Sequence, residues 1–166
     1  MKLELNITGS QDNQNQEEAD PDNFFKSITP ILESELKSLM PASQNYDTAE
    51  ISITFVDEDE MHALNFTYMD VDAATDVLSF PMLDNIEEPE QNTPFLILGD
   101  VVICESEMRK IYPDLNYTEA LCLMLAHSFL HLLGFDHATP EEEAVMFTKQ
   151  NDIKDLMIDA LNKNNK

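Results

Sequence analysis

The sequence predicts an α+β fold in which helices cover a small mixed β-sheet and one histidine-bearing helix packs centrally. Short alternating or apolar stretches typical of strands are interspersed with longer stretches of helical periodicity. The chain has 166 residues, of which 43% are hydrophobic, so it is long enough to bury one core. No internal repeat occurs. We therefore expect residues 1–166 to form a single domain.

The first part of the chain predicts a strand, a loop, a helix and a second strand. Apolar and polar residues alternate over Met1–Ile7, whereas Gly9–Asp22 is a polar run that indicates a solvated loop. Helical spacing follows over Phe24–Leu39. Pro30 inside it lacks the amide hydrogen that a helix interior needs, which predicts a kink or a restart. Ile51–Phe55 alternates again, as in a half-buried strand.

The middle of the chain predicts a helix followed by two strands. Asp57 can cap a helix on which His62 is interpreted as a surface residue. Asp76–Met82 is typical of a strand that breaks near Pro81, and Leu83–Pro94 is an acidic, proline-containing loop. Leu96–Cys104 is apolar enough to be a buried strand. The apolar residues of the capped helix are Met61, Leu64 and Tyr68.

Three helices are predicted in the last part of the chain. A short one over Glu105–Ile111 is stopped by Pro113. Thr118 can cap a long helix that runs to Gly134. Thr139–Glu142 carries the start signals of the last helix: a threonine cap, proline at the first helical position and a capping-box glutamate. The apolar face of that helix continues through Met146, Ile153, Met157 and Leu161.

Cysteine usage and hydropathy predict a cytoplasmic protein. Cys104 and Cys122 both lie in apolar segments and are interpreted as buried thiols, so a compartment that favours disulfides is not implied. The N-terminal segment has no continuous apolar core of the kind found in signal peptides. No stretch has the roughly 18 or more apolar residues of a membrane span.

Three of the four histidines lie in Leu125–His137 and predict a metal site. His127 and His131 are four residues apart, so on a helix they share one face and can converge on one cation. Gly134 can enter the left-handed conformation that ends a helix, which would return His137 as a third ligand. Three imidazoles with one open position are typical of catalytic zinc. The predicted central helix is therefore the metal-bearing one.

The same spacing also matches the metzincin metalloproteases, which need a glutamate directly after the first histidine as general base. Ser128 occupies that position and cannot take up a proton near neutral pH, so peptide hydrolysis is disfavoured. Asp136, beside the third histidine, has two equal interpretations. It either accepts a hydrogen bond from a ligating imidazole or is a simple turn residue. The apolar residues between the histidines are assigned to the core.

The stretch His127–His137 closely resembles the signature of the YbeY family, which runs His-Gly-x-Leu-His-Leu-x-Gly-Tyr-Asp-His. Two further blocks, Leu64–Pro81 and Leu98–Ile103, agree in order and spacing, so the resemblance extends from about Ile51 onward. The family comprises bacterial rRNA maturation factors described as single-strand-specific, metal-dependent endoribonucleases. Two positions depart from its pattern. Ser128 replaces a glycine, and Met69 stands where the family carries an arginine after a tyrosine.

The resemblance implies single-stranded RNA, in particular rRNA, as the substrate. The predicted partners further include ribosomal proteins but neither DNA nor a membrane. An all-imidazole ligand set favours one zinc ion, although nickel and other first-row ions suit the same ligands. Thr75, Asp76 and Ser79 lie in a shared block and can line a cleft, but strand-end hydrogen bonding is the favoured interpretation. No catalytic side chain is assigned.

The formal net charge of −24 is unusual for an RNA-binding protein, because lysine and arginine normally neutralise phosphates. Arg109 is the only arginine. The acidity either keeps the protein soluble, for instance in a salty cytoplasm, or suits a partner with a basic surface such as a ribosomal protein. Two functions therefore stay open. One is an endoribonuclease in rRNA maturation and ribosome quality control, weakened by Met69; the other is a catalytically impaired, metal-stabilised ribosome-associated factor.

Overall fold

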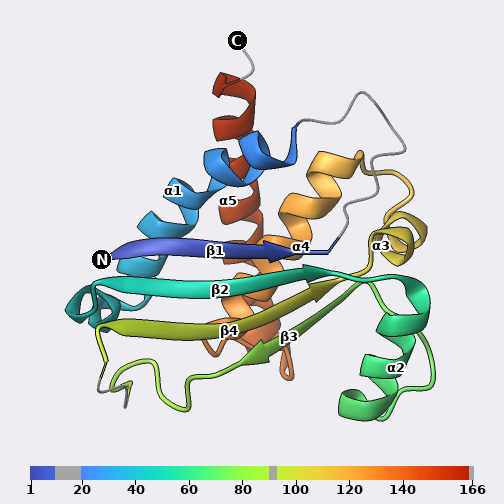
Figure 1. Ribbon diagram of the computed structural model, residues 1–166, viewed down its shortest axis with the longest axis horizontal. Helices are drawn as coiled ribbons and strands as arrows, with labels where there is room; N and C mark the ends of the chain where they lie inside the picture. The colour runs from blue at the N-terminus through green and yellow to red at the C-terminus, as the bar shows by residue number, and fades with distance from the viewer. Residues whose placement is uncertain (10–19, 90–92, 165–166) are drawn as a thin grey trace.

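The structure is a computed structural model that describes residues 1–9, 20–89 and 93–164. Figure 1 shows a single sheet with helices on one face and at one end. Most of the predicted loop over Gly9–Asp22, and part of the acidic loop over Leu83–Pro94, lie outside the described residues. The described residues of the acidic loop contain no helix or strand, as predicted.

The sheet is mixed, which confirms the predicted α+β class. It comprises four strands in the order β1 (Lys2–Thr8), β2 (Thr48–Phe55), β4 (Phe95–Ile103) and β3 (Val77–Pro81). β1, β2 and β4 are parallel neighbours, and β3 pairs antiparallel with β4. Helices connect the parallel strands, as parallel pairing requires.

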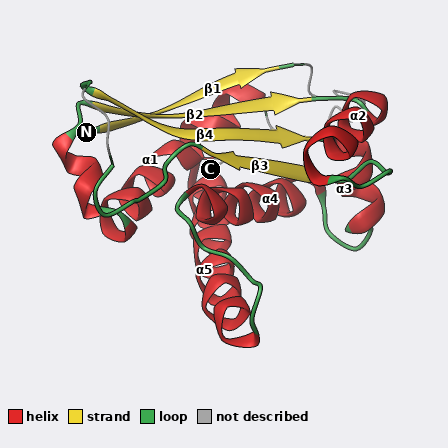
Figure 2. Cartoon of the chain, turned by 90° about the horizontal axis from the view of Figure 1, so that it is seen from below, coloured by secondary structure: helices red, strands yellow, loops and turns green. Residues whose placement is uncertain are grey.

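Helices α1 (Pro21–Leu39), α4 (Tyr117–Leu132) and α5 (Pro140–Asn164) cover one face of the sheet, whereas α2 (Glu58–Met69) and α3 (Glu105–Ile111) lie at one end (Figure 2). A short 3-10 helix, Pro41–Asn45, follows α1. The main core lies between the covered face of the sheet and the three long helices. A smaller cluster packs α2 against the strands and contains Met61, Leu78, Val102 and Cys104.

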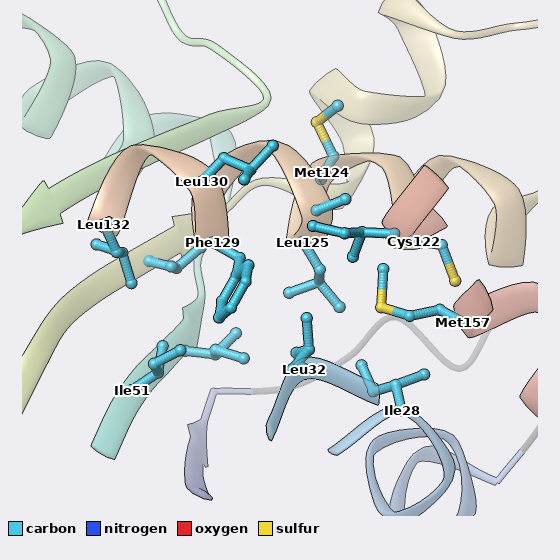
Figure 3. Close-up of a cluster of buried hydrophobic side chains, with 14 of the residues drawn as sticks. Ile28, Leu32, Ile51, Cys122, Met124, Leu125, Phe129, Leu130, Leu132 and Met157 are labelled. Atoms are coloured by element: carbon cyan, nitrogen blue, oxygen red, sulfur yellow. The ribbon is translucent and has the colours of Figure 1, made fainter. Parts of the chain in front are cut away.

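Helix α4 is central to the main core, as predicted. Its side chains Leu125 and Phe129 point toward Leu32 of α1 and Ile51 of β2 (Figure 3). Burying one such side chain contributes about 1.5–3 kcal/mol. Because ten of the sixteen residues of α4 are buried, the position of this helix is fixed by packing. The buried thiols Cys104 and Cys122 also agree with expectation.

The structure corrects the predicted cap of α4 and one of the two alternatives predicted at Pro30, the restart of the helix. Helix α4 begins earlier than a cap at Thr118, because Asn116 accepts the N–H of Glu119 at 2.9 Å and donates its own N–H to the Glu119 carboxylate at 3.1 Å. This reciprocal pair satisfies two amide hydrogens and makes Asn116 the N-cap. The chain does not restart at Pro30 either, since α1 continues through it as one helix. Within the described residues, no helix is both long and apolar enough to span a membrane.

Candidate metal centre

The three predicted histidines lie together at the C-terminal end of α4. His127 and His131 occupy its last turns, and the helix ends at Leu132. Gly134 then adopts a left-handed conformation, with φ of 84°. The N–H of Phe135 donates to the carbonyl of Leu130 at 3.0 Å, which closes the turn and leads the chain back toward the helix. The glycine therefore acts as the sequence predicted.

The turn brings His137 to the other two imidazoles. One ligand atom from each of His127, His131 and His137 lies within 4.8 Å of the other two. The Nε2 atoms of His127 and His131 are 3.0 Å apart. The ring of His137 lies 5.5 and 5.2 Å from the rings of His127 and His131, centroid to centroid. This is the one such cluster found among the described residues, and it can hold a metal ion.

Both helical imidazoles are fixed by acceptors at their other nitrogen. Nδ1 of His127 lies 2.7 Å from Oε1 of Gln150 on α5. Nδ1 of His131 lies 2.9 Å from the carbonyl oxygen of Phe135. Because both partners are oxygens that can only accept, each Nδ1 carries a hydrogen, and in the neutral imidazole each Nε2 then offers a lone pair. Such contacts are the usual supports of metal-ligating histidines.

Burial favours the neutral, metal-binding form of His131. Desolvation lowers the pKa of this imidazole, and the neighbouring His127 lowers it further. A histidine must be neutral to ligate a metal, so a lowered pKa widens the pH range in which the site is competent. His137 is the exposed member of the cluster, whereas the two helical histidines are half-buried. The site thus opens to solvent on the His137 side.

The surroundings of Asp136 and Ser128, which lie next to the triad, agree with a turn residue and with the lack of a general base. The carboxylate of Asp136 accepts the backbone N–H of His137 at 2.8 Å, which supports its role as a turn residue. Ser128 is fully buried, and its hydroxyl has no hydrogen-bond partner among the described residues. A residue at this buried position is poorly placed to take a proton from a solvent-derived nucleophile.

Thr75 and Asp76, from the second motif block, make hydrogen bonds at the start of β3, in agreement with the favoured strand-end interpretation. Asp76 accepts the N–H of Val77 at 2.9 Å and the hydroxyl of Thr75 at 3.1 Å. Its carbonyl accepts the N–H of Cys104 at 2.8 Å. Ser79 lies in β3 opposite Val101 of β4. These contacts account for Thr75 and Asp76 without a catalytic role.

Met69 is the last residue of α2, and 44% of its surface is exposed. The residue after it, Asp70, has a positive φ and ends the helix.

Elsewhere on the surface, Lys110 is bound by the carboxylates of Glu58 and Glu107 at 2.8 and 2.7 Å. The guanidinium of the single arginine lies 5.1 Å from the ring centre of Tyr117.

Comparison with known proteins places these features in a family. The model of the family described as Endoribonuclease YbeY matches residues 10–157. The chain belongs to the YbeY family. The triad, with its turn, thus lies at the family signature, and the family is one of endoribonucleases, which are hydrolases.

Individual relatives agree with this membership. The chain is 43% identical to Endoribonuclease YbeY of Geobacillus kaustophilus over 116 residues, which is 64% of this chain and 72% of that one. It is 37% identical to the Staphylococcus aureus protein of the same name over 139 residues, 80% and 85% of the two chains. The solution structure of TM1509 from Thermotoga maritima has the same fold, with a TM-score of 0.54 and 22% identity over 97% of this chain and 93% of that one.

Gln150 is the site residue that reasoning from sequence missed. It is the polar member of the otherwise apolar face of α5, and it is 91% buried. A buried amide at a core position needs a partner, which is a signal that could have indicated the contact. The partner itself lies 23 residues away on another helix.

Proposed function

We propose that this protein is a metal-dependent endoribonuclease that cleaves single-stranded RNA in rRNA maturation and ribosome quality control. The observation that carries the proposal is the coincidence of the YbeY signature with a converged triad of imidazoles. Relatives named Endoribonuclease YbeY support RNA as the substrate. The absence of a free general base at Ser128 argues against the metalloprotease reading of the same spacing.

His127, His131 and His137 would hold the ion as its protein ligands. The donor chemistry fits, because two lone pairs face each other at 3.0 Å and the third imidazole is close by. An ion bound there would polarise a phosphoryl oxygen and make a nearby water more acidic. Zinc suits three neutral nitrogens, and other first-row ions would compete for them.

The residues of the chain have separate tasks in this proposal. The half-buried imidazoles hold the site in place through Gln150 and the backbone of Phe135. The exposed side of His137 is where the RNA phosphate would enter. Met69, at the family's arginine position, supplies neither charge nor hydrogen-bond donors to the phosphoryl oxygens, so we infer a weak activity.

A second function has an observation in its favour. Lys110 is engaged by two carboxylates, and the net charge of −24 opposes binding to the RNA backbone. A catalytically impaired, metal-stabilised factor that binds a basic ribosomal protein would tolerate both Met69 and this acidity. In that case the metal would stabilise the fold and have no catalytic role.

The decisive experiment measures zinc content and RNA cleavage together. Purified protein loaded with one equivalent of Zn²⁺ is incubated with a labelled single-stranded RNA and with the same RNA in a duplex. Slow cleavage of the single strand, abolished by a chelator and by His131→Ala, would support the nuclease. Stoichiometric zinc without cleavage of either RNA would favour the binding factor.

We further propose that residues 1–166 form one domain and that the protein is cytoplasmic. The main core supports the first point, because it takes side chains from Leu3 in β1 to Leu161 in α5. Limited proteolysis that releases a stable fragment lacking either end of the core would contradict it. Fractionation of the source cells tests the second point.

A further inference from the structure

We propose that Gln150 is a positioning residue, which fixes the tautomer and orientation of His127 so that its Nε2 faces the metal. This inference rests on the proposed metal site but does not depend on RNA cleavage. Its starting point is the 2.7 Å contact between Oε1 of Gln150 and Nδ1 of His127. The contact joins α5 to the last turns of α4 across the main core.

The burial of Gln150 makes this contact specific. The side chain is only 9% exposed, and its helix neighbours on the same face, Met146 and Ile153, are buried core residues. An apolar residue would fill this position at no desolvation cost, whereas a buried amide without a partner costs about 1–3 kcal/mol. The buried amide therefore depends on His127 for a hydrogen-bond partner, and His127 depends on the amide for a fixed orientation.

The two helical imidazoles are supported differently. His131 is held by the carbonyl of Phe135, which belongs to the turn that ends α4 and is present whatever the side chains are. His127 is held by a side chain on a separate helix. Substitution can therefore remove the support of one ligand and leave that of the other unchanged.

The uncharged amide of Gln150 suits His127, because this imidazole has to be neutral both with and without a bound metal ion. With Oε1 toward the ring, the hydrogen of His127 lies on Nδ1, and its Nε2 faces Nε2 of His131 at 3.0 Å. Two lone pairs at that separation repel each other unless a positive charge lies between them. The orientation of Gln150 thus pre-arranges a site for a cation.

Two substitutions separate this role from simple packing. Gln150→Met keeps the length and fills the same space but has no acceptor, whereas Gln150→Glu keeps an acceptor oxygen. The matched control is Asn151→Met, which removes the exposed amide next to it in α5. Zn²⁺ affinity is measured by competition with a chromophoric chelator, and folding is checked by thermal unfolding with excess chelator.

We expect Gln150→Met to weaken Zn²⁺ binding by about 10–100-fold, the usual effect of losing such a contact. Gln150→Glu should bind within a few-fold of the wild type or more tightly, and Asn151→Met should be unchanged. Wild-type affinity in folded Gln150→Met, or equal weakening by Met and Glu, would overturn the proposal.

The nitrogen NMR shifts of wild-type, zinc-loaded protein provide a readout that needs no substitution. Protonated Nδ1 and zinc-bound Nε2 at His127 are the expected pattern. A hydrogen on Nε2 of His127 with zinc bound would refute the role of Gln150, even if Gln150→Met fails to fold. Because neither readout involves RNA, a protein that binds zinc in this way but cleaves nothing would refute the nuclease function alone.

Discussion

Replacing Gly99 by alanine should strongly destabilise the protein, because this glycine lies where β4, β3 and helix α4 meet. Its φ of +147° is one that residues with a side chain rarely adopt. A Cβ added there would lie 2.2 Å from the carbonyl oxygen of Phe80 and 2.8 Å from Cδ2 of Leu132. The first neighbour is backbone and cannot rotate away. The second is the residue after His131 and is fully buried.

Two effects add in the Gly99→Ala variant. The unfavourable backbone conformation costs on the order of 1–3 kcal/mol. Forcing a methyl group into a filled space costs about 1–3 kcal/mol more, because strands and helix must move apart. The combined loss of roughly 2–6 kcal/mol is large against a typical stability of about 5–15 kcal/mol. In a chain of this size each kcal/mol lowers Tm by about 2–4 °C.

Gly134→Ala is the matched control for the steric part. Gly134 also has a positive φ, +84°, but a Cβ there would meet nothing within 4 Å. It should therefore show only the conformational cost. Thermal and urea unfolding of both variants in excess chelator measures the difference without a contribution from bound metal. Equal destabilisation of the two variants would show that the close approach at Gly99 is not a constraint.

Three further outcomes follow from single residues. Met69→Arg should raise cleavage of single-stranded RNA by on the order of 100-fold at equal zinc content, since one preorganised donor is typically worth that much. Strong wild-type cleavage that this change leaves unaltered would contradict the importance of the position. The zinc-loaded protein should not hydrolyse casein, and Ser128→Glu should add little; chelator-sensitive proteolysis would show otherwise. Burial raises the pKa of Cys122 to about 12, so iodoacetamide at pH 8 should alkylate it only after denaturation. Rapid alkylation of the native thiol would count against the described packing.

The parts of the fold that are determined by residues close together in the sequence could be predicted from it. Alternation located β1 and β2, and start signals at Thr139 located α5, whose Glu142 N–H donates to the Thr139 hydroxyl at 3.2 Å. The cap of α4 was misplaced because Asn116 and Thr118 are both good cap residues. Only the reciprocal bond to Glu119 distinguishes them.

The histidine triad was likewise a local prediction, because all three histidines lie within one helix and the turn that ends it. The role of Gly99 was not predictable in this way. Glycine in a strand can mark a bulge or a close approach, and the choice depends on what packs against it. Here the neighbours are Phe80, nineteen residues earlier, and Leu132, thirty-three residues later.

The contact of Gln150 could be predicted in part, because the periodicity of α5 places this polar residue on the buried face of the helix. The apolar positions Met146, Ile153 and Met157 define the buried face of α5, and Gln150 falls on the same face four residues after the first of them. A polar side chain in such a register must find a partner in the core or lose stability. Helix α4 packs on α5 and carries His127, whose Nδ1 lies 2.7 Å from Oε1 of Gln150. The pattern thus indicates that a contact exists, and only the packing of α5 on α4 identifies His127 as its partner.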